Sequence, residues 1–576
     1  MPTSPGSGRV DQERTQEKER AQRLQEILGS KAFRKLVVAG PGTGKSFTFK
    51  ELLKTVGTDD NLALTFINLL AADLATALAG LAEAKTFHSF CRGLLHKRPA
   101  AGLTVNFSYY PQLGFIQEDD LRILGRNGVD RSAIEQRFHS LDDSDGIIFD
   151  AIKSGNTWDA VGHTDAVFRV LRELRLRPDA TPRFGQIVVD EYQDFSRLET
   201  EFIDLLATYS PTLVAGDDDQ ALYGFKGASP DFIRAAFDSG EWETFELPFC
   251  SRCTEVIVAA THDVVARAVE SGLLTDRLPK RYDCYLPEKE VDSQKHPKII
   301  HASCSVDRKG SPYPARYIAH SIAGLPAADI EDSWARSEPT ALVLGPGHLL
   351  TSVAAELETS RAIVSFNPAE RAHVEAWHGL RVLLENPTAP LGWRILLQTE
   401  KPDGWEEIVS DALAGKDLES LTRAEFKARW LALAEKVRQA RQIQPIPLDI
   451  SDDVREAVGI EVEELFARLG WTEPIETPEP DKTRPRVTLT TLTGAKGLQA
   501  RHVFVLGMNE GVFPRSNDAV TDLEVCQLIV ALTRTKSQCT LISVGNYAGK
   551  WMKPSVFLDW LSGRIATTKV DKTFFE

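Results

Sequence analysis

A glycine-rich segment at residues 39–46, Ala-Gly-Pro-Gly-Thr-Gly-Lys-Ser, limits the folds open to this chain more than any other feature. It follows the apolar run 36–39, which is typical of a strand buried on both faces of a parallel sheet. The glycines let the backbone turn tightly and point its N–H groups at phosphate oxygens, and a helix beginning near Lys45 adds its positive end. We therefore predict a phosphate-binding loop rather than an ordinary glycine turn.

Two side chains at the end of this segment fit phosphate chemistry. Lys45 is expected to reach the β- and γ-phosphates, and the Ser46 hydroxyl is expected to ligate Mg²⁺. The predicted cofactors are therefore ATP and Mg²⁺. The predicted nucleotide-binding residues of the loop are Gly40, Pro41, Gly42, Thr43, Gly44, Lys45 and Ser46.

A pair of acids follows a second apolar run, residues 186–189. Open α/β sheets place their ligands at the carboxyl ends of strands, so Asp190 and Glu191 should face the phosphate loop. Asp190 is expected to hold Mg²⁺ through water, and Glu191 to orient or deprotonate the attacking water. Two adjacent acids alone usually form a solvated loop; the strand and the phosphate loop favour the catalytic interpretation.

A third strand is predicted at residues 212–215, and polar and aromatic residues follow it. Gln220 is a neutral amide that can sense a γ-phosphate without titrating. Tyr223 and Phe225 are suited to stacking on nucleic-acid bases. Both rings fit the alternative that they belong to the core, where most aromatic side chains lie.

Taken in order, these segments and several later ones resemble superfamily 1 helicases of the UvrD/Rep type. Residues 65–68 and 86–90 are similar to the family's first two DNA-contact motifs. Residues 247–252 align with the segment whose arginine contacts the γ-phosphate. Residues 487–499 and 530–534 resemble the fifth and sixth motifs.

The resemblance implies an ATP hydrolase built from two RecA-like α/β domains, with Arg252 and Arg534 entering from opposite sides of the cleft between them. The catalytic residues it implies are Lys45, Asp190, Glu191, Gln220, Arg252 and Arg534. It adds Gln220, Arg252, Gly497 and Arg534 to the nucleotide-binding set and gives Ser46 and Asp190 as metal ligands. The DNA-binding residues it implies are Thr65, Asn68, His88, Tyr223, Phe225 and Thr491.

The activity implied is that of a 3′→5′ DNA helicase or single-stranded DNA translocase in repair, recombination or replication restart. Its partners would be single-stranded and partly duplex DNA. One alternative is a motor subunit of a repair or phage-defence complex that needs a protein partner, such as a nuclease, to unwind. An alternative from another class is a nucleotide-gated DNA-binding switch with little turnover.

Several positions depart from the family pattern. Ser251 stands where the family usually has a tyrosine that stacks on adenine. Thr493 replaces a usual histidine, and Gln499 a usual glutamate. Gln22 and Gln25 both lie near the place of the glutamine that reads adenine, and a solvated position is the favoured interpretation for either.

The resemblance also predicts a division of the chain into two discontinuous sheet domains, each with a mostly helical insertion. Domain 1A is expected at 1–95 and 180–255, with insertion 1B at 96–179. Domain 2A is expected at 256–366 and 483–576, with a reduced 2B-like insertion at 367–482.

Composition sets wider limits. The net charge of −15 argues against a histone-like binder, although a local basic groove can still bind DNA. The sequence contains no apolar stretch of about 18 residues that would predict a membrane span. The N-terminus lacks the apolar region of a signal peptide. We therefore expect a cytoplasmic protein. The lone Cys-x-x-Cys at 250–253 favours reduced thiols over zinc. The basic helix predicted at 423–441 fits either a solvated face or a DNA contact.

Overall fold

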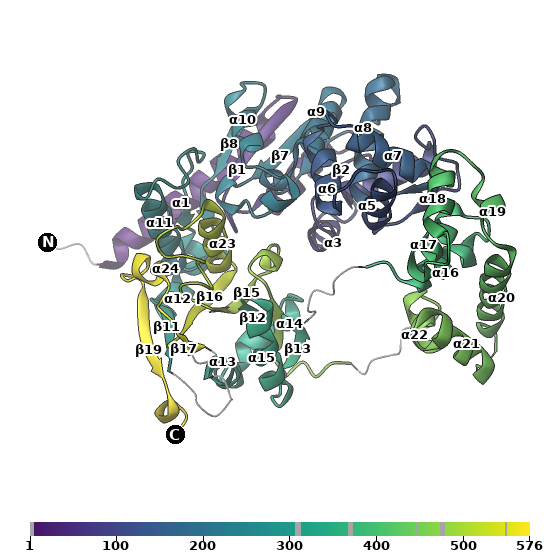
Figure 1. Ribbon diagram of the computed structural model, residues 1–576. Helices are drawn as coiled ribbons and strands as arrows, with labels where there is room; N and C mark the ends of the chain where they lie inside the picture. Colours follow the sequence, from purple (N-terminus) through teal and green to yellow (C-terminus); the bar gives the residue numbers. More distant parts are fainter. Residues whose placement is uncertain (1–4, 306–312, 367–372, 444–445, 473–478, 548–549) are drawn as a thin grey trace.

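Two parallel sheets, each flanked by helices, hold most of the chain in the computed structural model (Figure 1). The structure describes residues 5–305, 313–366, 373–443, 446–472, 479–547 and 550–576. The predicted α/β class is therefore confirmed. None of the described helices combines the length and the apolar run needed to span a bilayer.

The first sheet has the strand order β3-β2-β6-β7-β1-β8, and its pairings are parallel. Its strands are β1 (Arg34–Ala39), β2 (Leu62–Thr65), β3 (Glu83–Thr86), β6 (Ile187–Val189), β7 (Thr212–Gly216) and β8 (Glu243–Leu247). The helices around it are α1 (Pro5–Gly29), α2 (Lys45–Val56), α3 (Asn68–Ala77), α4 (Phe87–Lys97), α9 (Arg197–Tyr209) and α10 (Asp231–Asp238). Because β1, β6 and β7 are close neighbours, their carboxyl ends meet at one edge.

A group of four helices, here called the first helical group, lies between β3 and β6 in sequence. Its members are α5 (Leu113–Ile123), α6 (Arg131–Ser140), α7 (Ile147–Thr157) and α8 (His163–Leu176), with the short parallel pair β4 (Ser108–Tyr109) and β5 (Ala160–Val161). The apolar face of α8 packs on α4 of the first sheet. This packing fixes the group beside the carboxyl edge of β2 and β3.

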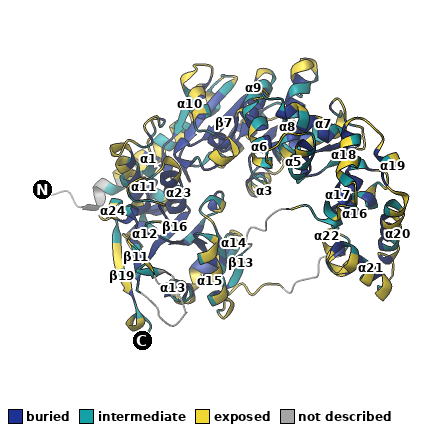
Figure 2. Cartoon of the chain, in the orientation of Figure 1, coloured by how far each residue is buried: buried dark blue, intermediate teal, exposed yellow. Residues whose placement is uncertain are grey.

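The second sheet has the order β13-β14-β12-β15-β16-β11-β19, again with parallel pairings. Its strands are β11 (Ile299–Cys304), β12 (Ala341–Leu344), β13 (Ile363–Phe366), β14 (Arg486–Thr490), β15 (Ala500–Leu506), β16 (Thr535–Val544) and β19 (Ile565–Val570). Its helices are α13 (Tyr313–Ala323), α14 (Ala327–Ala335), α15 (Gly347–Glu358), α23 (Asp522–Thr533) and α24 (Val556–Trp560). The central strands are buried, whereas the edge strand β19 is largely exposed (Figure 2).

The two sheets are joined by a segment that packs on both. It contains β9 (Phe249–Cys250), α11 (Glu255–Glu270), β10 (Asp283–Cys284) and α12 (Leu286–Lys295). Helix α11 lies against α23, and one apolar cluster continues from the first sheet through α11 into β12, β15 and α23. The carboxyl edges of the two sheets are therefore held close together.

Seven helices, here called the second helical group, separate β13 from β14 in sequence. They are α16 (Ala376–Glu385), α17 (Pro390–Glu400), α18 (Trp405–Leu413), α19 (Leu418–Leu421), α20 (Ala424–Ala440), α21 (Leu448–Val458) and α22 (Val462–Arg468). Figure 1 shows them beside α5 and α7 rather than beside the second sheet. The predicted domain limits stay predictions, and the one at 367 adjoins residues 367–372, outside the described part.

The predicted basic helix is α20, and much of its charge is paired within the group. Arg429 pairs with Glu400, Lys436 pairs with Asp453, and Arg438 donates to backbone carbonyls of α16. These contacts favour the solvated-face alternative over a DNA contact for this helix.

Candidate functional site

The glycine-rich loop connects β1 to α2 at the carboxyl edge of the first sheet, and α2 begins at Lys45. Gly42 and Gly44 have φ values of 72° and 99°, which side chains other than glycine rarely adopt. A methyl group at Gly42 would also lie 2.5 Å from Cβ of Arg252. The loop thus has the strand, the turn and the helix start that a phosphate group requires.

The paired acids follow β6, opposite the loop. Lys45 Nζ donates to Glu191 Oε1 at 2.9 Å and lies 3.6 Å from Asp190 Oδ1. Glu191 has a φ of 56°, in the left-handed region that is uncommon for a residue with a side chain. This backbone conformation turns both acids toward the ammonium group that the sequence predicts for phosphate binding.

Charge and burial shift the pKa values of the two acids in opposite directions. Burial raises the pKa of Asp190 to about 6, although Lys45 opposes the shift. Burial acts the same way on Glu191, but the ammonium groups of Lys45 and Lys496 outweigh it and hold its pKa well below the usual range. Burial alone would lower the pKa of Lys45, but Glu191 and Asp190 raise it above its usual value. Glu191 is therefore an ionised acceptor at neutral pH.

A continuous set of hydrogen bonds runs from Glu191 to the second sheet. Gln193 donates to Glu191 Oε2 at 2.6 Å and accepts from the backbone N–H of Asp217 at 2.9 Å. Gln220 donates to Asp217 Oδ2 at 2.7 Å and accepts from Arg534 at 3.0 Å. The predicted sensor Gln220 therefore lies between the acids and an arginine of the second sheet.

The two predicted arginines meet around Thr533. Arg534 caps the C-terminus of α23, and Arg252 follows β9 and donates to the carbonyl of Thr533 at 3.2 Å. Burial and the neighbouring Arg252 lower the pKa of Arg534 to about 10, so it stays charged at neutral pH. Two guanidinium groups thus border the space above the phosphate loop.

Sequence reasoning did not assign a role to Lys496, which the structure places at the centre of the site. Its side chain is 2 % exposed. It pairs with Asp194, donates to the carbonyl of Gln220 at 2.8 Å and lies 3.4 Å from Glu191 Oε2. The next residue, the predicted Gly497, has a φ of 86°. The available signal was its position directly before that glycine, inside segment 487–499.

A second lysine that the sequence did not single out neutralises the acids after β7. Lys280 is buried and pairs with Asp217, with Asp218 at 2.6 Å and with Asp219 at 2.9 Å. The carboxylates that follow β7 lie close enough to share one cation, and the ammonium group of Lys280 is that cation. The three acids are Asp217, Asp218 and Asp219. We therefore assign no metal to these three acids.

The loop is covered by residues from the joining segment. The backbone N–H of Ser251 donates to the carbonyl of Gly42 at 3.0 Å. The hydroxyl of Tyr282 donates to the carbonyl of Pro41 at 3.0 Å, and its ring would lie 2.7 Å from a methyl group at Gly40. Ser251 therefore contacts the loop through its backbone N–H and through its hydroxyl, which donates to the same carbonyl at 3.4 Å, and the aromatic ring beside the loop comes from Tyr282.

Neither candidate glutamine for adenine lies in a buried position. Gln22 and Gln25 are exposed on α1, and Gln22 donates to Glu26. The buried glutamine of α1 is Gln16, which donates to the carbonyl of Cys284 and accepts from the N–H of Leu286, both at 3.0 Å. Gln16 ties α1 to α12, and no sequence signal had distinguished it.

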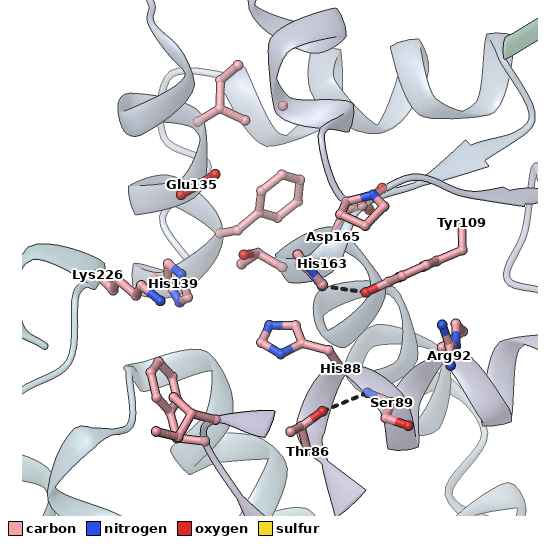
Figure 3. A pocket seen from close by; sticks show the side chains of 18 of the residues that line it. Thr86, His88, Ser89, Arg92, Tyr109, Glu135, His139, His163, Asp165 and Lys226 are labelled. Carbon is pink, nitrogen blue, oxygen red and sulfur yellow. Dashed lines mark hydrogen bonds between the residues drawn. The ribbon is translucent and has the colours of Figure 1, made fainter. Parts of the chain in front are cut away.

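A pocket of about 630 Å³ opens between the first sheet and the first helical group (Figure 3). The predicted residues Asn68 and His88 line it, together with Lys226. Its lining from the first helical group and the residues next to it is Tyr109, Pro111, Gly114, Gln117, Ile134, Glu135, Phe138, His139, Gly162, His163, Thr164 and Asp165. The predicted residues Thr65, Tyr223, Phe225 and Thr491 are not among the lining residues.

The two predicted stacking rings differ in exposure. Tyr223 is 8 % exposed and packs on Phe66 with ring centroids 5.0 Å apart, whereas Phe225 is 69 % exposed. Lys226 Nζ lies 5.1 Å from the centroid of Phe66 and within 6 Å of both other rings. Tyr223 fits the core alternative, and Phe225 keeps an open face beside a cation.

The remaining predicted DNA contacts lie at the carboxyl ends of strands. Thr65 ends β2 and is fully buried, with its hydroxyl unpartnered in the structure. Thr491 follows β14, is exposed, and accepts from the N–H of Gly494 at 3.1 Å.

Three histidines face the pocket and are neutral at physiological pH. Burial, together with His163 and His139, lowers the pKa of His88 to about 3. Burial and Lys226 lower the pKa of His139 to about 4 and act in the same direction on His163. Figure 3 shows the three rings directed at a common space. Lys226 and Arg92 supply the permanent positive charge of this pocket.

The family model and the relatives described next are all helicases. A family model of the UvrD/REP helicase N-terminal domain matches residues 159–239. UvrD1, an ATP-dependent DNA helicase of Mycobacterium tuberculosis, is 28 % identical over 309 residues, which cover 42 % of this chain and 39 % of that protein. DNA helicase II of Haemophilus influenzae is 25 % identical over 281 residues, covering 40 % and 38 %.

A DNA helicase II homologue of Mycoplasma pneumoniae matches over a longer range. It is 20 % identical over 634 aligned residues, which cover 92 % of this chain and 84 % of that protein. The chain spans about two fifths of the length of the first relatives it matches. The range matched by the family model, 159–239, includes Asp190, Glu191 and Gln220.

Proposed function

We propose that this chain, a member of the UvrD-like superfamily 1 helicases, is an ATP-driven motor that moves along single-stranded DNA in the 3′→5′ direction and separates duplex DNA. The observation that carries the proposal is the hydrogen-bond route from Glu191 through Gln220 to Arg534, because it links the acids of one sheet to an arginine of the other. Because the residues of the site come from both sheets, the site is complete only when the two sheets are close together. Repair, recombination or replication restart in the cytoplasm is the setting we propose.

The residues at the loop fit MgATP. The glycines at 42 and 44 leave room for phosphate, and Lys45 offers a cation whose present partners are carboxylates. Ser46 and Asp190 would hold Mg²⁺, which neutralises phosphate charge when bound. A phosphate group competes with Glu191 for Lys45, so nucleotide binding would free Glu191.

The chemistry then belongs to this chain's own side chains. Glu191 is ionised and accepts the proton of the attacking water, while Gln193 holds its second oxygen. Arg252 and Arg534 stabilise the negative charge that develops on the transferred group. Since Arg534 is positioned from the second sheet, full activity requires the two sheets to be close.

We propose that single-stranded DNA binds at the pocket between the first sheet and the first helical group. Lys226 and Arg92 would contact phosphates, and the open face of Phe225 would stack on a base. The 3′→5′ direction is proposed because Gln193 and Asp194 after the paired acids, and the Asp-rich segment that follows β7, resemble the 3′→5′ branch of the superfamily more than the RecD-like branch. Rearrangement of the cleft with each ATP would shift this grip along the strand.

The test is steady-state ATP hydrolysis with and without single-stranded DNA. We expect strong stimulation by DNA, loss of it in Lys45→Ala, and a fall of about 10²- to 10⁴-fold in Glu191→Gln. The matched control is Glu241→Gln, an exposed acid before β8 at the opposite edge of the sheet, which should hydrolyse ATP normally.

Duplexes with single-stranded tails test direction. Unwinding of a substrate with a 3′ tail and not of one with a 5′ tail is expected. Tight ATP binding with negligible hydrolysis in the presence of DNA would refute the motor and favour a nucleotide-gated switch.

A further inference from the structure

The second helical group shares a hydrophobic core with the first helical group. Tyr110, Leu113, Ile116, Trp158 and Ala160 lie in the same apolar cluster as the buried side chains of α16–α22. Among the described residues, that cluster contains no side chain from the strands of the second sheet. The second helical group is therefore packed on the insertion of the first sheet domain, although the predicted domain order makes it an insertion of the second.

A buried ion pair lies at the centre of this interface. Arg394 of α17 and Asp120 of α5 are both 0 % exposed, and Arg394 Nε donates to Asp120 Oδ1 at 2.9 Å. Arg394 also donates to Asp119 at 2.9 Å. The other oxygen of Asp120 accepts from Ser154 and from the indole of Trp158, each at 2.5 Å. The carboxylate is satisfied only when both helical groups are in place.

Two further contacts flank this pair. The hydroxyl of Tyr110 lies 3.2 Å from Nδ1 of His378, and Arg122 pairs with Glu406 at 2.8 Å. Together with Arg394, these contacts join three helices of the second group to residues 110–122. Separating the groups would expose the apolar cluster and leave charges without partners, which folded proteins avoid.

Helix α5 is also a wall of the pocket. Gly114 and Gln117 line the pocket, whereas Leu113 and Ile116 belong to the shared cluster, as expected for two faces of one helix. The carboxylates that pair with Arg394 therefore lie on the same helix that lines the space assigned to DNA.

We propose that the two helical groups form one body that stays intact through the ATP cycle, and that Arg394 is a positioning residue that holds α5 at the DNA pocket. The first part stands on the interface alone, and the role of Arg394 at DNA rests on the proposed function.

Chemical cross-linking tests the single body. Arg122→Cys and Glu406→Cys place two thiols at an exposed part of the interface, and the seven native cysteines are all buried. A short bismaleimide should join the pair equally well in the free protein, with DNA, and with DNA plus a non-hydrolysable ATP analogue. The two single-cysteine variants are the controls for reaction at native thiols.

The cross-linked protein should keep the ATPase and unwinding rates of the untreated double variant within about twofold. A yield that falls when DNA or nucleotide is added, or a larger change in unwinding after cross-linking, would overturn the single body. The yield is read from a gel and needs no activity, so it remains informative if the motor proposal fails.

Substitution of Arg394 tests its positioning role. In Arg394→Met, the DNA concentration that half-saturates ATPase stimulation should rise by at least about fivefold, while kcat at saturating DNA changes little. Arg394→Lys should recover part of the loss, and Arg455→Met, which removes an exposed pair in the same group, should behave as the parent.

An Arg394→Met protein that remains folded by circular dichroism and has unchanged half-saturation would refute the positioning role. If that variant does not fold, Arg394→Lys alone must show the rise in half-saturation, and an unchanged value there refutes the role equally. Direct binding of labelled single-stranded DNA by anisotropy gives the same comparison without ATP hydrolysis.

Discussion

Lys496 shows how one side chain from the second sheet can complete the chemistry of the first. It is the cation that Asp194 pairs with, and it shares Glu191 with Lys45. Burial raises the pKa of Asp194 to about 6, and Lys496 limits that rise. The site therefore depends on charges supplied across the boundary between the sheets.

Removing this lysine should be costly. Lys496→Met leaves the buried carboxylate of Asp194 without its cation, and loss of one partner of a buried pair costs about 3–5 kcal/mol. We expect the urea midpoint to fall accordingly, and the double variant Lys496→Met/Asp194→Leu to lose less than the single one. Lys54→Met, which removes an exposed pair with Glu51, should cost under about 1 kcal/mol. Equal losses in the single and double variants would contradict this account.

Lys226 should contribute one phosphate contact. For single strands, each neutralised phosphate adds about 0.7 to the slope of log affinity against log salt, so Lys226→Ala should lower that slope by about this amount. The measurement is an anisotropy titration of labelled single-stranded DNA at several salt concentrations. Lys416→Ala, an exposed lysine of the second helical group, is the control and should keep the parent slope. If Lys226→Ala kept the salt slope of the parent protein, Lys226 would not contact DNA.

At the scale of elements, helices α16 and α17 cross at two glycines. A methyl group at Gly379 would lie 2.8 Å from Leu396 and 3.0 Å from the carbonyl of Gly392. Gly93, inside α4, has open space at the same position.

Gly379 and Gly93 should respond oppositely to replacement by alanine. Gly379→Ala should lower the free energy of unfolding by about 1–3 kcal/mol because the helices must move apart. Gly93→Ala should raise it by about 0.5–1 kcal/mol because alanine restricts the unfolded chain and favours the helix. Thermal unfolding of both variants provides the comparison, and stabilisation by both would show that the helix crossing is looser than described.

The interface between the helical groups should weaken in acid. Burial lowers the pKa of His378 to about 4 although Glu375 opposes the shift, whereas an unfolded histidine has a pKa near about 6.5. The unfolded chain therefore binds more protons between these values, so stability is complete above about pH 6.5 and falls as the pH drops toward 4.

His378→Gln tests that dependence. It should lose less stability than the parent between pH 7.5 and pH 5, while the exposed His320→Gln on α13 should follow the parent. Tryptophan fluorescence during urea unfolding reports on this region, since six of the ten tryptophans lie in or pack against its apolar cluster: Trp158, Trp377, Trp393, Trp405, Trp430 and Trp471. An identical pH dependence in His378→Gln would exclude this histidine as the source.

The sequence predicts elements where the signal is local. Strands β1, β6 and β7 were predictable because short apolar runs precede polar, functional residues, as central parallel strands require. Strand β3 (Glu-Ala-Lys-Thr) carries no such run, because it is an edge strand with little burial. Edge strand β19 was missed for the same reason.

The parts of the site that were not predicted depend on distant pairing. Lys496 meets an acid 302 residues away, and Gln16 meets a backbone 268 residues away. Nothing beside these residues in sequence indicates such partners. The residues predicted to be catalytic lie close together, because each follows a strand or lies at the end of a helix, and those positions can be read from local patterns.

At the scale of the whole molecule, the second sheet interleaves early and late strands. Strands β11, β12 and β13 precede the second helical group, and none of them pairs with another of the three. Their neighbours β14, β15, β16 and β19 all begin at or after Arg486. The first sheet differs, because β2 and β3 pair directly.

A chain cut at residue 482 should therefore keep one sheet and lose the other. We expect limited proteolysis of such a fragment to spare residues of the first sheet and both helical groups and to cut within 299–366. The full chain under the same protease is the reference. Protection of 299–366 in the fragment would show that these strands find other partners.

During synthesis, this strand order has a temporal consequence. Between the end of β11 at Cys304 and the start of β14 at Arg486, the ribosome adds 182 residues (486 − 304). At about 5–20 residues per second this takes on the order of 10–40 s. By the later part of that interval, β11, β12 and β13 have all been synthesised and have unsatisfied edges, and such edges attract other chains. Folding helpers that shield nascent chains would act here, before the second sheet is complete and before Arg534 has been added.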